Sequence, residues 1–413
     1  MKINYYLLVI LCFCIATVAQ ADDPVQSACS DGGEMRLDAP GKSMEGLPVL
    51  DQSTGNGNEA GGLCYSYVAS QMIDSWQQKN GTRTAGRISS PFHIAFNSAA
   101  DRNRTKYNGG DPCQAIESTV KSGGTCDHEH QFLATDRFNT RSFLYSLEEA
   151  WKSFQWQRDF TPYLRDEFRT PDLLARDLER RARENACSLA QPYMFAATNV
   201  AMFEATFKVL KKLYKDNQYF DADENDEEAR GHDKMSFMRD FANQMCLPKN
   251  SPITPKLAPA TPHRARCVAS NYGPNQQQAF QLDLLNKLKT NEMPVGVGYC
   301  SFLLQDSRRT HSPAGSHSVL RYGTDADHTP ECQFPTRGPD GNLAYTYRKS
   351  YHISMIMGKR WQNGKCQVLL RNTWGADACS AYSAAGLTDC QNGQLWIDLN
   401  ELANNSFAIR NIE

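Results

Sequence analysis

Apolar positions recur with helical spacing in the first third of the chain and alternate with polar positions in the last third. Residues 64–76 carry an apolar helical face, and from 291 onward β-branched and aromatic residues alternate between turn signals. The sequence therefore predicts an α+β chain with a helical lobe at 51–139 and an antiparallel β lobe at 291–413. Three helices are expected in the first lobe: 64–76, Pro91–Ser98, and one that Asp111-Pro112 begins and Gly123-Gly124 ends.

The segment between the lobes has a different pattern. Residues 140–248 show amphipathic helical spacing with charged faces, so we expect their aromatic side chains to pack in a core rather than line a cofactor site. Residues 250–266 are rich in Pro, Ala and Thr and are typical of a linker. We interpret 140–290 as a helical insertion and linker, where a protein inhibitor or partner could bind. The polar, Pro- and Gly-containing stretch 22–50 is expected to be an extended N-terminal segment.

The first residues have the features of a secretory signal peptide. Lys2 precedes an apolar run from Tyr5 to Val18, and Ala19-Gln20-Ala21 offers a small-residue cleavage site. The run is too short to span a bilayer comfortably and no other stretch qualifies, so no stable membrane insertion is expected. We predict a signal peptide at 1–21 and a secreted or periplasmic protein.

Cysteine content agrees with an oxidising compartment. The chain has 14 cysteines, of which Cys12 and Cys14 would leave with the signal peptide. The remainder predicts several disulfides, and the connectivity is open. Local spacing offers two bridges, Cys113–Cys126 and Cys379–Cys390.

Cys64 stands at the start of the first predicted helix, directly after a Gly-rich loop. A cysteine on the first turn of a helix lies at the positive end of the macrodipole and beside backbone donors, which favours the thiolate. The alternative is a structural cysteine that is buried or disulfide-bonded. Residues near the C-terminal end of the chain favour a catalytic role for Cys64 over a structural one.

Near the C-terminal end of the chain, two apolar runs flank Asn363-Gly364. This dipeptide is a strong signal for a tight β-hairpin turn. Folding about the turn brings His352, at the start of one strand, near Asn372, at the end of the other. A histidine oriented by an asparagine amide and presented to Cys64 would form a thiolate–imidazolium pair with its orienting group.

These motifs resemble the papain-like cysteine peptidases, and more closely the bacterial secreted branch of that family. The matches, in the family's order, are Asp51-Gln52, Gly62-Leu63-Cys64-Tyr65-Ser66-Tyr67, Asn108-Gly109-Gly110, Ser122-Gly123-Gly124-Thr125-Cys126, Pro294 through Cys300, His352 through Arg360, Arg371-Asn372-Thr373-Trp374-Gly375 and Gly393 through Ile397. They cover roughly 51–130 and 290–413.

The resemblance implies a two-lobe fold with the active site between the lobes, and a role for each matching residue. Cys64 would be the nucleophile, and Gln52 and the Cys64 amide the oxyanion donors. His352 would be the general base and acid, with Asn372 as its orienter and Trp374 as the aromatic cover.

The chain departs from the family pattern at three places. Gln52 stands twelve residues before Cys64, where the family usually has six, so the extra stretch must loop out. The positions of a common family disulfide hold Gly61 and Tyr107, which indicates that this bridge is missing. His317, in Gly315 through Gly323, also resembles the family's histidine strand.

The choice between the two histidines depends on hairpin geometry. His352 lies twenty residues before Asn372 with the Asn-Gly turn near the midpoint, whereas three prolines intervene after His317. The turn favours His352, and His317 stays open as the alternative.

No metal or cofactor is expected. Residues 221–228 begin like a calcium loop, but Asp226 stands where an EF-hand needs glycine. Residues 126–130 offer metal-ligand side chains without a second ligand pair at zinc-site spacing. The formal net charge of −2 gives no electrostatic case for nucleic acid.

The sequence thus predicts a secreted papain-like cysteine endopeptidase, which hydrolyses peptide bonds of polypeptide substrates through an acyl-enzyme. One alternative is a Cys–His amidase or transpeptidase on cell-wall peptides, which the same triad could serve. Another is an inactive papain-fold binding protein. A panel of protein and peptidoglycan substrates separates the first two, and thiol labelling of Cys64 separates either from the third.

Overall fold

A computed structural model describes residues 23–52, 62–83, 86–126, 227–246, 266–273, 275–304, 320–322, 330–337, 343–348, 351–384 and 386–413. The α+β class is confirmed, because these residues form a helical region and an antiparallel sheet. The expected signal peptide, His317 and most of the 140–248 insertion lie outside the described residues.

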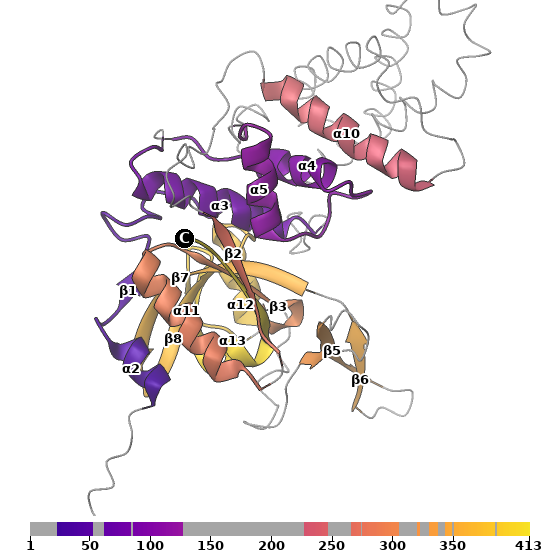
Figure 1. Ribbon diagram of the computed structural model, residues 1–413. Coiled ribbons are helices and arrows are strands. Elements are labelled where there is room, and N and C mark those ends of the chain that lie inside the picture. Colours follow the sequence, from indigo (N-terminus) through magenta and orange to yellow (C-terminus); the bar gives the residue numbers. More distant parts are fainter. Residues whose placement is uncertain are drawn as a thin grey trace, which may run out of the picture.

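The helical region follows the predicted pattern. It contains α3 (Cys64–Lys79), α4 (Pro91–Asp101), α5 (Pro112–Lys121) and α10 (Glu227–Cys246). Ser90 caps α4 and Asp111 caps α5, each with a proline in the first turn. Figure 1 shows α3, α4 and α5 stacked at one end of the sheet, with α10 beyond them.

The main sheet is antiparallel and is ordered β2-β11-β3-β7-β8-β10-β9, with β1 pairing to β7. Its strands are β1 (Met35–Arg36), β2 (Cys267–Asn271), β3 (Val295–Cys300), β7 (Tyr351–Gln362), β8 (Lys365–Arg371), β9 (Cys390–Gln391), β10 (Gln394–Asp398) and β11 (Ser406–Ile412). The pairing of β2 with β11 places 267–271 in this sheet, although the sequence analysis put these residues within the 140–290 insertion and linker.

The remaining elements surround this sheet or lie beside it. They are the helices α11 (Gln277–Asn291), α12 (Cys379–Ala384) and α13 (Leu399–Asn405), the short helices η1 (Ser301–Leu304) and η3 (Ala376–Ala378), and a separate three-stranded sheet of β4 (Leu320–Tyr322), β5 (Pro330–Arg337) and β6 (Leu343–Arg348). The Cys300–Cys332 disulfide joins the end of β3 to this second sheet.

The β7–β8 hairpin forms as the Asn-Gly turn predicts. Asn363 and Gly364 both have positive φ, 53° and 73°, and Gln362 pairs with Lys365 across the turn. Both central residues of a type I′ turn need this conformation, which Asn and Gly adopt most readily. The register then runs to Met355 opposite Arg371, with one irregularity after Ile356.

The N-terminal segment 22–50 differs from the extended lead-in expected from its composition. Residues Pro24–Ser30 form helix α2, and the Cys29–Cys366 disulfide ties this helix to β8. The buried Lys359 of β7 donates from Nζ to the carbonyls of Ala28 (2.6 Å) and Asp31 (2.8 Å), at the C-terminal end of α2. A cation there complements the helix dipole and satisfies unpaired carbonyls.

Of the two disulfides expected from local spacing, the structure contains one and replaces the other. Cys379–Cys390 is confirmed. The Cys113–Cys126 bridge is wrong, because Cys113 pairs with Cys267. From Cys113 to its end at Lys121, helix α5 rises by about 12 Å, away from Cys113, whereas its first turn lies beside β2.

Close packing holds the helical region on the sheet. Helix α3 packs against β7 and β11, and a Cβ on Gly296 of β3 would lie 3.2 Å from Cγ1 of Val68. Glycine at this position therefore lets the first part of α3 approach the sheet.

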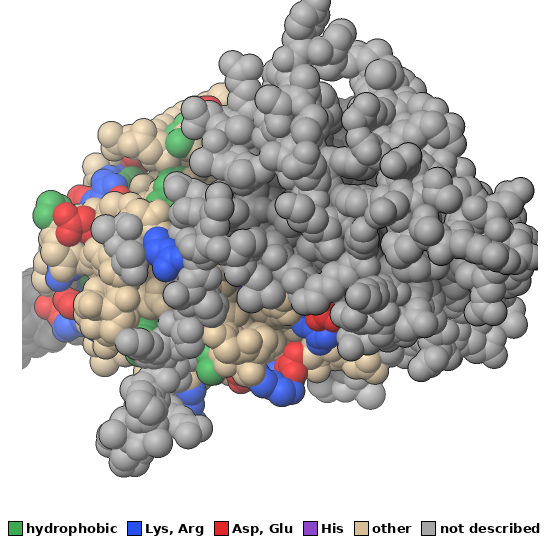
Figure 2. Space-filling view, turned by 90° about the horizontal axis from the view of Figure 1, so that it is seen from above, with side chains coloured by type: hydrophobic (Ala, Val, Ile, Leu, Met, Phe, Trp, Pro, Cys, Tyr) green, Lys and Arg blue, Asp and Glu red, His purple; other side chains and the backbone are tan. Residues whose placement is uncertain are grey.

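On the face seen in Figure 2, the basic and acidic side chains of the described residues are interspersed.

Helix α10, the described part of the insertion, packs on α4. Met235, Phe237 and Met238 are buried there. Nε2 of His93 lies 2.8 Å from Oδ1 of Asn243, and Nδ1 accepts from the Cys126 amide at 3.0 Å. A neutral imidazole with its proton on Nε2 satisfies both bonds.

The first prediction concerns the pH dependence of this contact. Burial lowers the pKa of His93 to about 4, below the value near 6.5 expected in the unfolded chain. The unfolded state therefore binds more protons, so His93 costs stability increasingly as pH falls from about 6.5 to 4, by up to about 3 kcal/mol. We expect denaturant midpoints of wild type and His93→Gln to differ less at pH 4.5 than at pH 7. A difference that does not change with pH would contradict the assignment.

Candidate active site

Cys64 is the first residue of α3 and is a free, buried cysteine, the only free one among the described residues. Leu63 stands at the cap position and no side chain caps the helix. The first amides of α3 therefore lack the side-chain acceptor that α4 and α5 have. A helix start of this kind offers backbone donors and a positive dipole end to a thiolate or an oxyanion.

His352 and Asn372 meet across the β7–β8 hairpin, as the sequence predicts. Nε2 of His352 lies 2.6 Å from Oδ1 of Asn372, and both side chains are buried. Because an amide oxygen only accepts, Nε2 carries the proton. Nδ1 is then the ring nitrogen that can serve a thiol.

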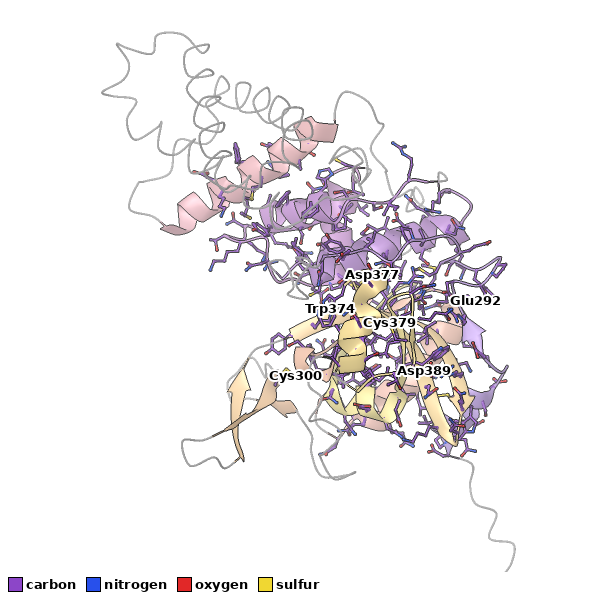
Figure 3. The ribbon with its side chains drawn as sticks, turned by 180° about the vertical axis from the view of Figure 1, so that it is seen from behind. Glu292, Cys300, Trp374, Asp377, Cys379 and Asp389 are labelled. Atoms are coloured by element: carbon purple, nitrogen blue, oxygen red, sulfur yellow. A yellow bond between two sulfur atoms is a disulfide. The ribbon has the colours of Figure 1, made fainter. Side chains whose placement is uncertain are left out.

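Two aromatic rings enclose the imidazole. The Trp374 ring lies 5.7 Å from it, centroid to centroid, and stacks in turn on Tyr382. Tyr299, which pairs with His352 in the β3–β7 register, contacts the imidazole edge to face at 5.5 Å. Figure 3 shows Trp374 and Asp377 where the sheet meets the helical region. Trp374 therefore lies against the imidazole ring of His352.

Gln52 is brought to the same place by backbone pairing. Its amide donates to the Thr373 carbonyl at 2.7 Å, and Asp51 forms a β-bridge with Trp374. The side chain is fully buried, and neither Oε1 nor Nε2 has a hydrogen-bond partner within the described part of the chain. An unsatisfied buried amide costs about 1–3 kcal/mol, which makes such a group a candidate for function.

The Asn108–Gly110 loop lies beside the start of α3. The Gly109 amide donates to the Gly62 carbonyl at 2.8 Å, and the Tyr65 hydroxyl donates to the Tyr107 carbonyl at 2.7 Å. A Cβ on Gly110 would lie 2.6–2.8 Å from the Tyr65 ring. Glycine is thus required for the loop to approach the residue next to Cys64.

A second cysteine–histidine contact has a structural explanation. Sγ of Cys126 lies 3.0 Å from Nδ1 of His93, but Cys126 is disulfide-bonded and cannot act as a nucleophile. His93 in turn binds Asn243 of α10. This pair anchors the insertion helix.

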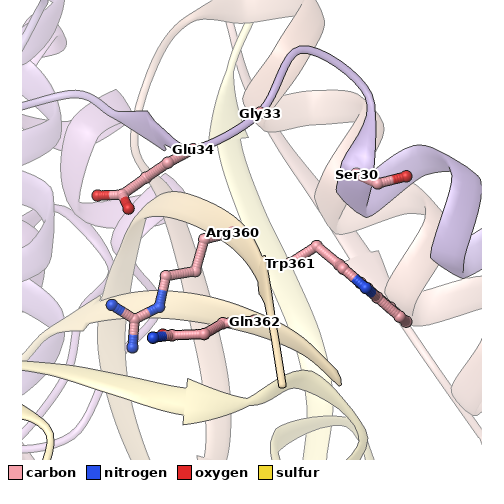
Figure 4. Close-up of a pocket in the computed structure, with 6 residues that line it drawn as sticks. All are labelled: Ser30, Gly33, Glu34, Arg360, Trp361 and Gln362. Carbon is pink, nitrogen blue, oxygen red and sulfur yellow. The ribbon is translucent and has the colours of Figure 1, made fainter. Parts of the chain in front are cut away.

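A surface pocket lies at the opposite end of β7 from His352. It is lined by Ser30, Gly33, Glu34, Arg360, Trp361 and Gln362 (Figure 4). Arg360 stacks over Trp396 at 4.2 Å and forms an ion pair with Asp389. Its guanidinium is therefore engaged in packing the strand ends, and the pocket contains no nucleophile paired with a base.

The described residues contain neither a metal-binding cluster nor a membrane-spanning helix. In the described ranges no group of three or more His, Cys, Asp or Glu side chains could hold a metal ion. None of the described helices has the length and apolar character needed to cross a membrane.

Two contacts of this site were not foreseen from the sequence. The Ser354 hydroxyl donates to Oδ1 of Asn372 at 3.0 Å, and the Tyr299 hydroxyl lies 2.7 Å from Oγ of Ser354. Alternation along β7 is the signal that could have found Ser354, because residues two apart in a strand share a face.

Comparisons with known proteins find a similar solved structure but no match in sequence. No protein-family model matches the chain, and no curated protein matches it in sequence. Among solved structures it is similar to xylellain, a cysteine protease from Xylella fastidiosa, at 12% identity and a TM-score of 0.35, over 92% of this chain and 85% of that one. A likeness this distant leaves the function to be argued from the chain's own residues.

The second prediction tests the approach of the Asn108–Gly110 loop to Tyr65. Gly110→Ala should destabilise the protein by roughly 1–3 kcal/mol, because the added methyl group overlaps a fully buried ring. Gly273→Ala is the matched control, since its Cβ would meet only the Gln276 side chain at 3.7 Å. Thermal denaturation of both variants makes the comparison, and equal midpoints would show that the loop relaxes freely.

Proposed function

We propose that the protein is a secreted cysteine endopeptidase of the papain-like type, with Cys64 as nucleophile, His352 as base and acid, and Asn372 as orienter. The observation that carries the proposal is the buried 2.6 Å contact between His352 and Asn372, on a strand against which the Cys64 helix packs. Of the two candidate histidines, His352 is supported by this contact with Asn372.

The chemistry begins with transfer of the Cys64 proton to Nδ1 of His352. The thiolate attacks the carbonyl carbon of the scissile peptide, and the carbonyl oxygen becomes an oxyanion. The Cys64 amide and Nε2 of Gln52 are the donors we assign to this oxygen. The unsatisfied amide of Gln52 supports the assignment, because its donor has no competing acceptor among the described residues.

Collapse of the tetrahedral intermediate breaks the peptide C–N bond, and the imidazolium Nδ1–H protonates the leaving amine. A thioester to Cys64 is left. Water then attacks the thioester carbonyl while Nδ1 takes a proton from it, and cleavage of the C–S bond releases the carboxylic acid and regenerates Cys64. Asn372 accepts from Nε2 throughout, so the ring keeps one orientation and its positive charge is stabilised.

The secreted or periplasmic location is part of the proposal. Four disulfides join described cysteines, and such bridges persist in oxidising compartments. We assign the 140–248 insertion a role in restricting access to the site or in binding a protein partner. Its described helix α10 packs on the side of α4, so it can act on the helical region directly.

The alternative enzyme activities would use the same nucleophile, Cys64, on other substrates. A Cys–His amidase or transpeptidase would use the identical acyl-transfer steps on a cell-wall peptide, with an amine replacing water in the transpeptidase. An inactive binding protein would keep the fold without turnover. The free state of Cys64 and the His352–Asn372 bond favour an active enzyme over the binding protein.

The third prediction tests the nucleophile and its base. Cys64→Ala and His352→Ala should each lower kcat by about 10³-fold or more, with little further loss in the double variant, because the two groups act as a unit. Turnover of protein substrates and of peptidoglycan fragments is measured for each. An epoxide inhibitor should label Cys64 in the wild type and fail to label it in Cys64→Ala.

Several outcomes would change the conclusion. Full activity in His352→Ala with loss in His317→Ala would transfer the base to His317. Turnover of peptidoglycan alone would identify the amidase, and an unlabelled Cys64 without turnover would leave the binding protein.

The fourth prediction concerns Gln52. Gln52→Ala should lower kcat by about 10²-fold or more with a smaller change in KM, because an oxyanion donor acts mainly in the transition state. Gln52→Glu is a useful companion, since it keeps the shape and removes the donor when ionised. Steady-state kinetics on one peptide substrate measures both, and an unchanged kcat would assign the oxyanion to another donor.

A further inference from the structure

The side-chain oxygen of Asn372 accepts from more than the catalytic histidine. Oδ1 receives Nε2–H of His352 at 2.6 Å, the Thr373 amide at 2.8 Å and the Ser354 hydroxyl at 3.0 Å. The nitrogen of the same amide, Nδ2, has no hydrogen-bond partner within the described residues. The orientation of the amide therefore depends on the donors around its oxygen.

The hydroxyl protons in this cluster have a fixed direction. Ser354 has one proton and gives it to Oδ1 of Asn372, which can only accept. The Tyr299 hydroxyl, 2.7 Å from Oγ of Ser354, must therefore donate to that oxygen. Ser354 and Tyr299 are fully buried, so water does not compete for these bonds.

We propose that Ser354 and Tyr299 are positioning residues for His352, and that their hydroxyls form an ordered relay, from Tyr299 to Ser354 to Asn372, that holds the Asn372 amide in place. The inference rests on the proposed function, because it assigns His352 the catalytic role. If the amide turned over, Nδ2 would face the donors of Ser354, Thr373 and His352 together. Each donor on Oδ1 thus opposes the flip that would leave His352 without its acceptor.

The sheet register explains how the relay forms. Ser354 lies two residues after His352 in β7, so both side chains share one face. Tyr299 stands directly opposite His352 in β3, and its long side chain reaches the diagonal neighbour Ser354. The same ring packs against the imidazole at 5.5 Å. One tyrosine therefore limits the ring's movement and completes the relay.

The relay acts on the imidazolium through Asn372. A fixed Oδ1 stabilises the protonated ring, so loosening it should lower the pKa of His352. Among the described residues, the titratable groups we place around this ring are the Tyr299 hydroxyl and the Cys64 thiol, and Asp51 is the charged residue bridged to Trp374. The test therefore removes Cys64 where the pKa itself is measured.

The fifth prediction is kinetic. Ser354→Ala should lower kcat by roughly 10-fold to 100-fold with little change in KM, because a small misplacement of a catalytic group is costly. The alkaline limb of the kcat/KM profile should move to lower pH. In an Asn372→Ala background the same change should add less than about 2-fold, because the relay acts only through Asn372.

Two control variants and one further relay variant accompany this measurement. Ser70→Ala removes another buried serine hydroxyl, which donates to the Ser89 carbonyl at 2.6 Å, and should leave kcat unchanged. Ser354→Thr keeps the donor and should retain most of the activity. Tyr299→Phe removes one oxygen from the start of the relay and should have a smaller effect than Ser354→Ala in the same direction. Circular dichroism and thermal midpoints confirm that each variant folds.

A spectroscopic measurement separates the relay from the proposed activity. Nitrogen NMR of the histidine rings in Cys64→Ala should show His352 with its proton on Nε2. Adding Ser354→Ala should produce a mixture of tautomers and a lower pKa. This readout needs no substrate.

The outcomes are distinct. An unchanged tautomer and an unchanged kcat in Ser354→Ala overturn the relay, and so does an equal loss of kcat with and without Asn372. If the wild type neither hydrolyses peptides nor reacts at Cys64, the proposed function fails and the NMR measurement alone decides the relay. A tautomer that depends on Ser354 would then support it, and one that does not would overturn it.

Discussion

The antiparallel pairing of β7 with β8 is the constraint on which the site depends. Its two-residue turn at Asn363-Gly364 fixes the register, and a shift by one residue would turn His352 to the other face of the sheet. Because β7 also pairs with β3, the same register places Tyr299 against the imidazole. A local turn thus determines contacts among three strands, and the helical region packs on the surface that results.

The N-terminal segment is the second part of this arrangement. Cys29–Cys366 and the Lys359 contacts hold α2 against the hairpin, and buried Arg371 donates from Nη1 to the Leu47 carbonyl at 3.0 Å. Burial lowers the pKa of Arg371 to about 10, so it stays charged at neutral pH. The segment ends in the backbone pairs that place Gln52. The backbone pairs with Thr373 and Trp374 therefore fix the position of this candidate oxyanion donor.

Sequence reasoning succeeded where the signal was local. The Asn-Gly turn, the proline-started helices after Ser90 and Asp111, and the helix beginning at Cys64 all follow from short-range chemistry. It failed where the partner was distant. The 22–50 segment takes its structure from residues more than three hundred positions away, and composition says nothing about them. Cys113 pairs with Cys267 rather than the nearer Cys126, because helix geometry outweighs sequence distance.

The Cys113–Cys267 disulfide has a consequence for the long insertion. Its two cysteines are 154 positions apart and lie on either side of 140–248, so the bridge closes a covalent ring that contains the whole insertion. A single break anywhere in that ring would leave the two pieces joined through sulfur. Such a chain would keep its size under oxidising conditions and separate into two fragments only after reduction. A protease could therefore reshape the insertion while the candidate nucleophile and its base stay in one molecule.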